Sequence, residues 1–161
     1  MHSENKKYSK MKKLEIIGSG DNFTAVTTGS FNELREHEID FGGGVVLKGK
    51  VFAGTALGAT GSEISFQTFA LGEGSTFLHA HKTHEELYII VSGEGEFQVD
   101  GKTFAVAQGS VVRVAPAGMR ALRNTGNDDM VMICIQYKAN SFGADDTPAA
   151  DGVIAEGGVE W

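Results

Sequence analysis

Short runs of β-forming residues, separated by tight turn signals, follow one another along most of this chain. In EFQVDGKTFAV the Asp100-Gly101 pair predicts a two-residue hairpin, and SGEG (92–95) marks another turn. The 22 glycines against 2 prolines suit many turns, because tight turns often need positive φ. Strands spaced by roughly 8–12 residues without intervening helices predict an antiparallel sandwich or barrel.

The length of 161 residues suits one domain with a hydrophobic core. We expect an N-terminal arm over residues 1–30, a barrel over residues 31–140 and a C-terminal tail over residues 141–161. The tail is expected to pack on the barrel or on a partner subunit, or to add a short edge strand around VIA. NELREHE predicts a short helical turn, and GTALGATG (54–61) predicts a flexible connection. The expected strands are VVLKGKVF (45–52), EISFQTFAL (63–71), ELYIIVSG, EFQV, KTFAV, SVVRV, RALRN and MVMICIQYK.

The charge distribution argues against a nucleic-acid or membrane partner. The formal net charge is −7, and the one lysine-rich stretch lies between Lys6 and Lys13, whereas a binder of nucleic-acid backbones normally carries a basic stripe. No apolar run approaches the roughly 18–20 residues of a membrane span, and no apolar segment follows the N-terminal basic residues as in a signal peptide.

Cys134 is the single cysteine, which excludes an internal disulfide. We therefore expect a cytoplasmic protein.

Three of the five histidines lie in FLHAHKTHEELYIIVSG (77–93). Because side chains alternate along a strand, His79 and His81 share one face, and Glu86 and Tyr88 share one face of the following strand. Two imidazoles and a carboxylate form a recognised ligand set for Fe(II), and also for Zn, Mn, Ni or Cu. A carboxylate that enters the apolar run LYIIV needs a partner, and a bound cation would supply one. The segment therefore predicts a metal site formed by His79, His81 and Glu86, with Tyr88 lining the same pocket.

Other interpretations of these polar residues stay open. A His-x-His pair in a strand is frequently no more than surface polarity. His84 falls at an expected turn, so it is either exposed or adjacent to the site. His37 joins the site if the N-terminal segment folds over the barrel mouth. Cys134 is expected to be a buried, inert thiol, because it lies among apolar β-formers.

This stretch resembles the first signature motif of the cupin superfamily. His79-Ala80-His81 is followed by four residues, Glu86, six residues and Gly93. The resemblance covers roughly residues 63 to 137. It implies an all-β jelly-roll barrel, also called a double-stranded β-helix, with short N- and C-terminal extensions. Similar small cupins are often dimers, so the resemblance also implies a homodimer.

The glycine, proline and asparagine positions of the second cupin motif are present, but its histidine is missing. Gly109 is followed by Pro116-Ala117-Gly118 and by Asn124, and Arg120 or Ala121 stands in the place of the histidine, depending on the direction of counting. Three interpretations follow for Arg120. In the first, His79, His81 and Glu86 hold a metal alone. In the second, Arg120 points into the cavity and attracts a carboxylate or phosphate. In the third, Arg120 pairs with Glu86, no metal binds, and the pocket takes an organic ligand. An arginine at the start of a strand can also extend outward to solvent.

A fold of this kind does not select one activity. The first hypothesis is a small metalloenzyme that acts on a polar small molecule, with a divalent ion (Fe, Mn, Zn or Ni) as Lewis acid or redox centre. Arg120 and Tyr88 would then contact the substrate, and no catalytic residue is assigned. The second hypothesis is a non-catalytic module that binds or senses a small ligand in the same cavity.

Overall fold

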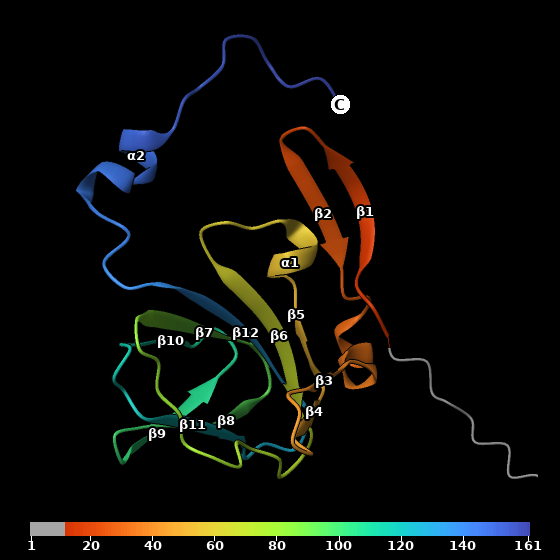
Figure 1. Ribbon diagram of the computed structural model, residues 1–161, viewed down its shortest axis with the longest axis vertical. Helices are drawn as coiled ribbons and strands as arrows, with labels where there is room; N and C mark the ends of the chain where they lie inside the picture. The colour runs from red at the N-terminus through yellow and green to blue at the C-terminus, as the bar shows by residue number, and fades with distance from the viewer. Residues whose placement is uncertain (1–11) are drawn as a thin grey trace, which may run out of the picture.

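The computed structural model describes residues 12–161, and most of the described strands belong to two antiparallel sheets. The larger sheet contains β5 (Lys50–Phe52), β6 (Glu63–Phe69), β7 (His84–Ser92), β10 (Val111–Val114) and β12 (Met130–Lys138). The smaller sheet contains β8 (Glu94–Val99), β9 (Lys102–Ala107) and β11 (Arg120–Asn124). Their strand orders are β10-β7-β12-β6-β5 and β11-β8-β9, and together they form the barrel (Figure 1).

The hydrophobic core lies between the two sheets. Phe97 of the smaller sheet and Ile90, Met130 and Met132 of the larger sheet are almost completely buried. Strands β8 and β9 are joined at the expected hairpin, where Asp100 and Gly101 both adopt positive φ (50° and 80°). The all-β class predicted from the turn spacing is confirmed.

Part of the segment expected to be an N-terminal arm forms regular secondary structure. Strands β1 (Glu15–Gly20) and β2 (Phe23–Thr27) pair as a hairpin that projects away from the barrel (Figure 1). The next turn is a 3₁₀ helix, η1 (Phe31–Glu36), which confirms the predicted helical turn. Ser30 caps it, because its hydroxyl accepts from the Asn32 amide while the Glu33 carboxylate accepts from the Ser30 amide. The first eleven residues of the expected arm lie outside the described residues.

The expected strand over residues 45–52 is in fact two strands in different sheets. β4 (Val46–Lys48) pairs with β3 (Glu38–Asp40), whereas β5 pairs with β6. Gly49 separates them with a φ of 77°. Its amide donates to the His37 carbonyl (2.7 Å), and its carbonyl accepts from the Thr68 amide (2.8 Å). The chain therefore turns at Gly49, because only a residue without Cβ readily adopts this conformation so close to Thr68.

The expected flexible connection over residues 54–61 contains a helical turn instead. Helix α1 (Gly54–Leu57) begins where the Gly54 amide donates to the Glu63 carboxylate (2.7 Å), and it ends at Gly58, whose φ is 67°. Glu63 belongs to β6, the strand that follows the helix. The small residues of the segment 54–61 gave no sign that a carboxylate from that strand would cap a helical turn.

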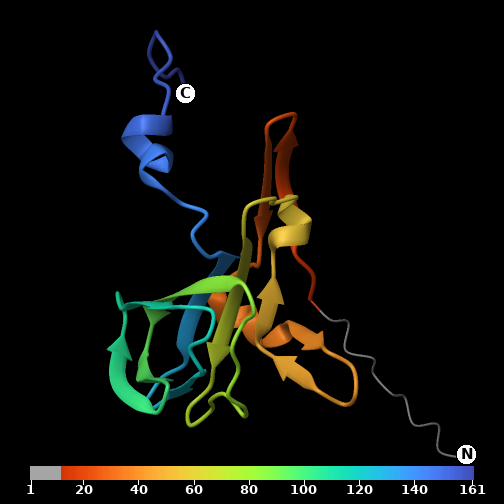
Figure 2. The same ribbon diagram turned by 60° about the vertical axis from the view of Figure 1, so that its left-hand side comes forward.

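The tail after β12 leaves the barrel. A short 3₁₀ turn, η2 (Ala144–Asp146), and a single helical turn, α2 (Pro148–Asp151), precede an extended end (Figure 2). Val153, Ile154 and Trp161 are exposed along almost their whole surface, and the alternative edge strand around VIA does not form. Packing of this tail on a partner subunit stays a prediction. None of the helices in residues 12–161 has the length and apolar character needed to cross a bilayer.

Candidate metal centre

The two histidines of the His-x-His pair are held in an extended segment between β6 and β7. The His79 amide donates to the Arg120 carbonyl (3.3 Å), and the Arg120 amide donates to the His79 carbonyl (3.0 Å). The His81 amide donates to the Pro116 carbonyl (2.8 Å). These bonds tie the segment to the start of β11 and to the turn before it. Both imidazoles lie on the same side, as the alternation predicts, with ring centroids 5.2 Å apart.

Glu86, the third residue of β7, brings its carboxylate to these imidazoles. His81 Nε2 lies 3.1 Å from Glu86 Oε1, and His79 Nε2 lies 3.8 Å from Oε2. One ligand atom from each of the three residues falls within 4.8 Å of the others, and within residues 12–161 no other trio of metal-ligating side chains converges in this way. Glu86 is 6% exposed, so the carboxylate is largely removed from bulk water.

Tyr88 and Arg120 also meet the Glu86 carboxylate. The Tyr88 hydroxyl donates to Oε2, and the Arg120 Nη1 atom lies 3.2 Å from the same oxygen. Arg120 Nη2 donates to the Ala115 carbonyl (2.8 Å). The guanidinium is completely buried, so the outward orientation considered for Arg120 is wrong. Of its nitrogens, Nε and Nη1 make no hydrogen bond to the described residues.

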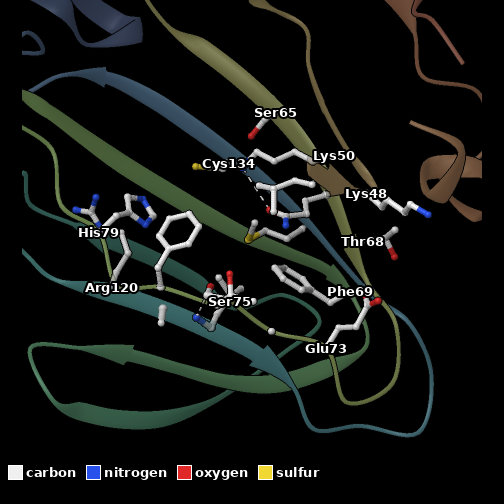
Figure 3. A pocket seen from close by; sticks show the side chains of 18 of the residues that line it. Lys48, Lys50, Ser65, Thr68, Phe69, Glu73, Ser75, His79, Arg120 and Cys134 are labelled. Atoms are coloured by element: carbon white, nitrogen blue, oxygen red, sulfur yellow. Dashed lines mark hydrogen bonds between the residues drawn. The ribbon is translucent and has the colours of Figure 1, made fainter. Parts of the chain in front are cut away.

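The site lies on the wall of a cavity of about 1050 Å³, which β5, β6, β7, β12 and the start of β11 enclose together with the β3–β4 connection (Figure 3). Much of the lining is apolar, and its large apolar side chains include Phe41, Phe52, Phe69, Phe77, Leu122 and Met132. The cavity is therefore mostly apolar with a polar cluster at one end, which is the usual composition of a small-molecule site.

Sequence and structural comparisons agree with this architecture. Residues 65–136 match the Cupin domain family model. The crystal structure of a cupin protein from Bacteroides fragilis is 31% identical, and the alignment covers 73% of this chain and 94% of that one with a TM-score of 0.62. This chain belongs to the cupin superfamily. The expected double-stranded β-helix is thereby confirmed.

Two curated proteins match the cupin region. An uncharacterized protein of Methanocaldococcus jannaschii is 34% identical over 62 residues, and the oxalate-binding protein of Thermotoga maritima is 32% identical over 71 residues. The matches cover 38% and 44% of this cupin, and 50% and 59% of those relatives. The cupin thus spans little more than half the length of the curated relatives that it matches.

The protonation states at the cluster suit a bound cation. Burial opposes ionisation of Glu86, but His79, Tyr88, His81 and Arg120 together lower its pKa to about 2. Burial lowers the pKa of His81, although Glu86 opposes this change. A neutral imidazole and a carboxylate are the forms that bind metal ions. The donors of this cupin therefore fit a divalent ion in type and spacing, whereas the buried charge of Arg120 would oppose a second cation beside it.

Two residues of β12 complete the surroundings of the cluster. The Gln136 amide nitrogen lies 3.1 Å from each ring nitrogen of His81, so it can hold the imidazole in place. Cys134 Sγ lies 3.5 Å from Glu86 Oε1, and burial raises the pKa of this thiol to about 12. The thiol is therefore protonated and inert, as expected from its apolar strand.

The other two histidines of the described region do not belong to the cluster. His37 is buried outside the cavity, where its Nε2 lies 3.1 Å from the Thr28 carbonyl. His84 is exposed at the start of β7, with its ring centroid 6.3 Å from that of His81. Lys50 and Glu63 also line the cavity. The sequence did not indicate them as cavity residues, because their position depends on pairing between distant strands.

Proposed function

We propose that this cupin binds one divalent metal ion with His79, His81 and Glu86 and acts as an enzyme on a polar small molecule. The observation that carries this proposal is the convergence of three ligand atoms within 4.8 Å on the wall of a large cavity. Three protein ligands leave coordination positions open for water or substrate, as catalytic metal sites require.

The ligand set of two nitrogens and one oxygen suits Fe, Mn, Zn or Ni. A bound ion would supply Lewis-acid or redox chemistry. The protein supplies the arrangement around it. Tyr88 directs the Glu86 carboxylate by donating to Oε2, and Gln136 holds the imidazole of His81. Arg120 is expected to contact the substrate, but its guanidinium is fully covered. We therefore propose that it acts on the ligand through Glu86.

Metal analysis of purified protein tests the proposal. Wild-type protein is expected to retain close to one equivalent of a transition metal after removal of loosely bound ions. A double variant, His79→Ala with His81→Ala, is expected to lose that metal. His84→Ala is the matched control, because His84 is a neighbouring histidine outside the donor group. Equal metal contents in the double variant and the control would contradict the proposal.

A second function is supported by the ion pair between Arg120 and Glu86. The buried guanidinium already gives the carboxylate a cationic partner, so the fold does not require a metal for that purpose. In this alternative the cupin binds or senses a small ligand without catalysis. Protein that takes up no metal at neutral pH, yet binds small molecules in the cavity, would favour this alternative.

A homodimer and a cytoplasmic location stay predictions. The exposed apolar residues of the β1–β2 hairpin, Ile16, Ile17 and Phe23, support an association between copies. Light scattering coupled to size-exclusion chromatography measures the mass directly. A mass of one chain at micromolar concentration would exclude the dimer.

A further inference from the structure

Lys50 is a cation inside the cavity without an anionic partner. It belongs to β5 and pairs in register with Gln67 of β6. Its ammonium donates one long hydrogen bond (3.3 Å) to Gln67 Oε1 and lies 5.2 Å from the centre of the Phe52 ring. No carboxylate of residues 12–161 lies within salt-bridge distance of it. An ammonium has three donors, so most of its capacity is left for a ligand.

The other charges of the cavity wall are already paired or lie at its edge. Arg35 binds the Glu73 carboxylate, and Arg120 faces Glu86. Glu63 accepts from backbone amides at the start of α1 and β6. Lys48 is exposed, so Lys50 is the interior cation that remains for a ligand.

The cavity wall carries more positive than negative charge, although the whole chain has a net charge of −7. Four cationic side chains face three carboxylates, and a bound divalent ion would increase the excess. The cavity therefore attracts an anion more strongly than the surface does. The cations are Arg35, Lys48, Lys50 and Arg120, and the carboxylates are Glu63, Glu73 and Glu86.

The sheet register fixes how far Lys50 lies from the metal-ligating cluster. Inward-facing residues form three successive rows across β5, β6, β12 and β7. The first row contains Lys50 with Gln67, the second Ser65 with Cys134, and the third Gln136 with Glu86. The outer rows are about 13 Å apart along the strands, because each row is two residues from the next. The Lys50 side chain runs toward Cys134 in the middle row, so its ammonium lies closer to the cluster than the spacing of the outer rows (Figure 3).

We infer that Lys50 recognises the carboxylate of an organic acid whose apolar body fills the cavity and whose other end reaches His79, His81 and Glu86. The aromatic walls between the two ends favour an apolar body. A two-carbon diacid has no apolar body to place against these walls. This inference rests on the proposed function, since it gives the class of substrate for the same site.

The environment of Lys50 agrees with this assignment. Burial lowers the pKa of Lys50, while Glu86 opposes the change. The charged ammonium is therefore costly in the empty cavity, and a bound carboxylate removes part of that cost. A neutral ligand of the same shape gains no such contribution.

Binding of matched acids and amides tests the inference. Hexanoate and 3-phenylpropionate are titrated against hexanamide and 3-phenylpropionamide by calorimetry, with oxalate as a short diacid. The wild-type protein is expected to bind at least one of the long acids more tightly than its amide and more tightly than oxalate. If neither acid binds more tightly than its amide, the inference is overturned, whatever the behaviour of variants.

Lys50→Met removes the charge and keeps much of the side-chain volume. It is expected to weaken binding of the acid about tenfold or more and to leave binding of the amide unchanged. Lys102→Met removes an equal charge from the exposed end of β9 and is expected to retain the wild-type affinity. Unchanged acid affinity in Lys50→Met would assign the anion to another residue and overturn the inference.

The metal proposal and the Lys50 inference fail in different measurements. Lys50→Met is expected to retain the metal content of the wild type, because Lys50 is no ligand. A protein without metal that still prefers the acid over the amide through Lys50 contradicts the metal proposal alone. A protein with metal and no preference for the acid contradicts the inference alone.

Discussion

The guanidinium of Arg120 lies 3.2 Å from Oε2 of Glu86. Counting back from Asn124, Arg120 stands where the second cupin motif carries a histidine, and counting forward from Gly118, Ala121 stands there. Both groups are buried, and the same carboxylate faces His79 and His81. A fixed positive charge thus occupies the surroundings of a potential cation site. Arg120 gives the carboxylate a cationic partner, and it would compete with a metal ion bound at the proposed site.

Replacing Arg120 with methionine is expected to have opposite effects on metal affinity and on stability without metal. Affinity is expected to rise roughly tenfold, because the repulsion between two cations is removed. The metal-free variant is expected to lose about 3 kcal/mol of unfolding free energy, because Glu86 loses its buried partner. Metal titration and urea unfolding, with and without metal, measure both effects. Arg123→Met, an exposed change on the same strand, should alter neither, and a fall in metal affinity for Arg120→Met would refute the competition.

Gln136→Leu is expected to lower metal affinity by about tenfold, because the amide that holds the His81 ring is removed. Gln67→Leu is the matched control, since Gln67 faces the same cavity from a row distant from the histidines. Competition with a chelator of known affinity measures both variants. Equal affinities of the two variants would show that Gln136 does not support His81.

Gly49→Ala is expected to destabilise the fold more than Gly42→Ala. Both glycines have φ near 80°, so each alanine costs about 1–2 kcal/mol for its left-handed backbone. At Gly49 the new Cβ would also lie 2.9 Å from Thr68 Cγ2 and 3.0 Å from the Thr68 carbonyl, whereas nothing lies within 4 Å at Gly42. A further loss of about 1–3 kcal/mol is expected at Gly49. Urea unfolding of the two variants compares them, and equal losses would be contrary to this expectation.

The pair formed by Arg35 and Glu73 gives a pH-dependent contribution to stability. Nη1 and Nη2 of Arg35 both donate to the Glu73 carboxylate, and this bonding lowers the pKa of Glu73 below its ordinary 4.5. The contribution is fully present above that ordinary value and is lost as pH falls through the lowered pKa. Because both groups are partly exposed, we expect about 1 kcal/mol or less.

Thermal unfolding of wild type and Glu73→Gln at several pH values checks this expectation. The wild type should be the more stable protein at neutral pH, and the difference should diminish in acid. A difference that stays constant down to the acid range would mean that the ion pair does not cause it.

Local patterns in the sequence were sufficient to predict those features whose formation depends on residues close together in the chain. The Asp100-Gly101 hairpin forms because both residues tolerate positive φ. His79, His81 and Glu86 converge because alternation places the two imidazoles on one side, and the chain bends at residues 82–83 between them and Glu86. The Ser30 cap likewise involves residues within three positions of one another.

Features that depend on distant segments were not predictable in the same way. The division of β4 from β5 requires Thr68 beside Gly49, and helix α1 requires Glu63 at the Gly54 amide. The location of Lys50 in the cavity follows from pairing across β5, β6 and β12. Nothing within a few residues of Gly49, Gly54 or Lys50 signals these partners. The burial of Arg120 also follows from tertiary packing, since the sequence allowed an inward or an outward side chain.

The chain has one tryptophan, Trp161, which is its last residue and is fully exposed at the end of the extended tail. Its emission therefore reports the solvent around the tail, and melting of the barrel leaves it nearly unchanged. Circular dichroism is the appropriate spectroscopic signal for the barrel. A blue shift of the tryptophan emission on concentrating the protein would instead report that the tail has become covered by another chain.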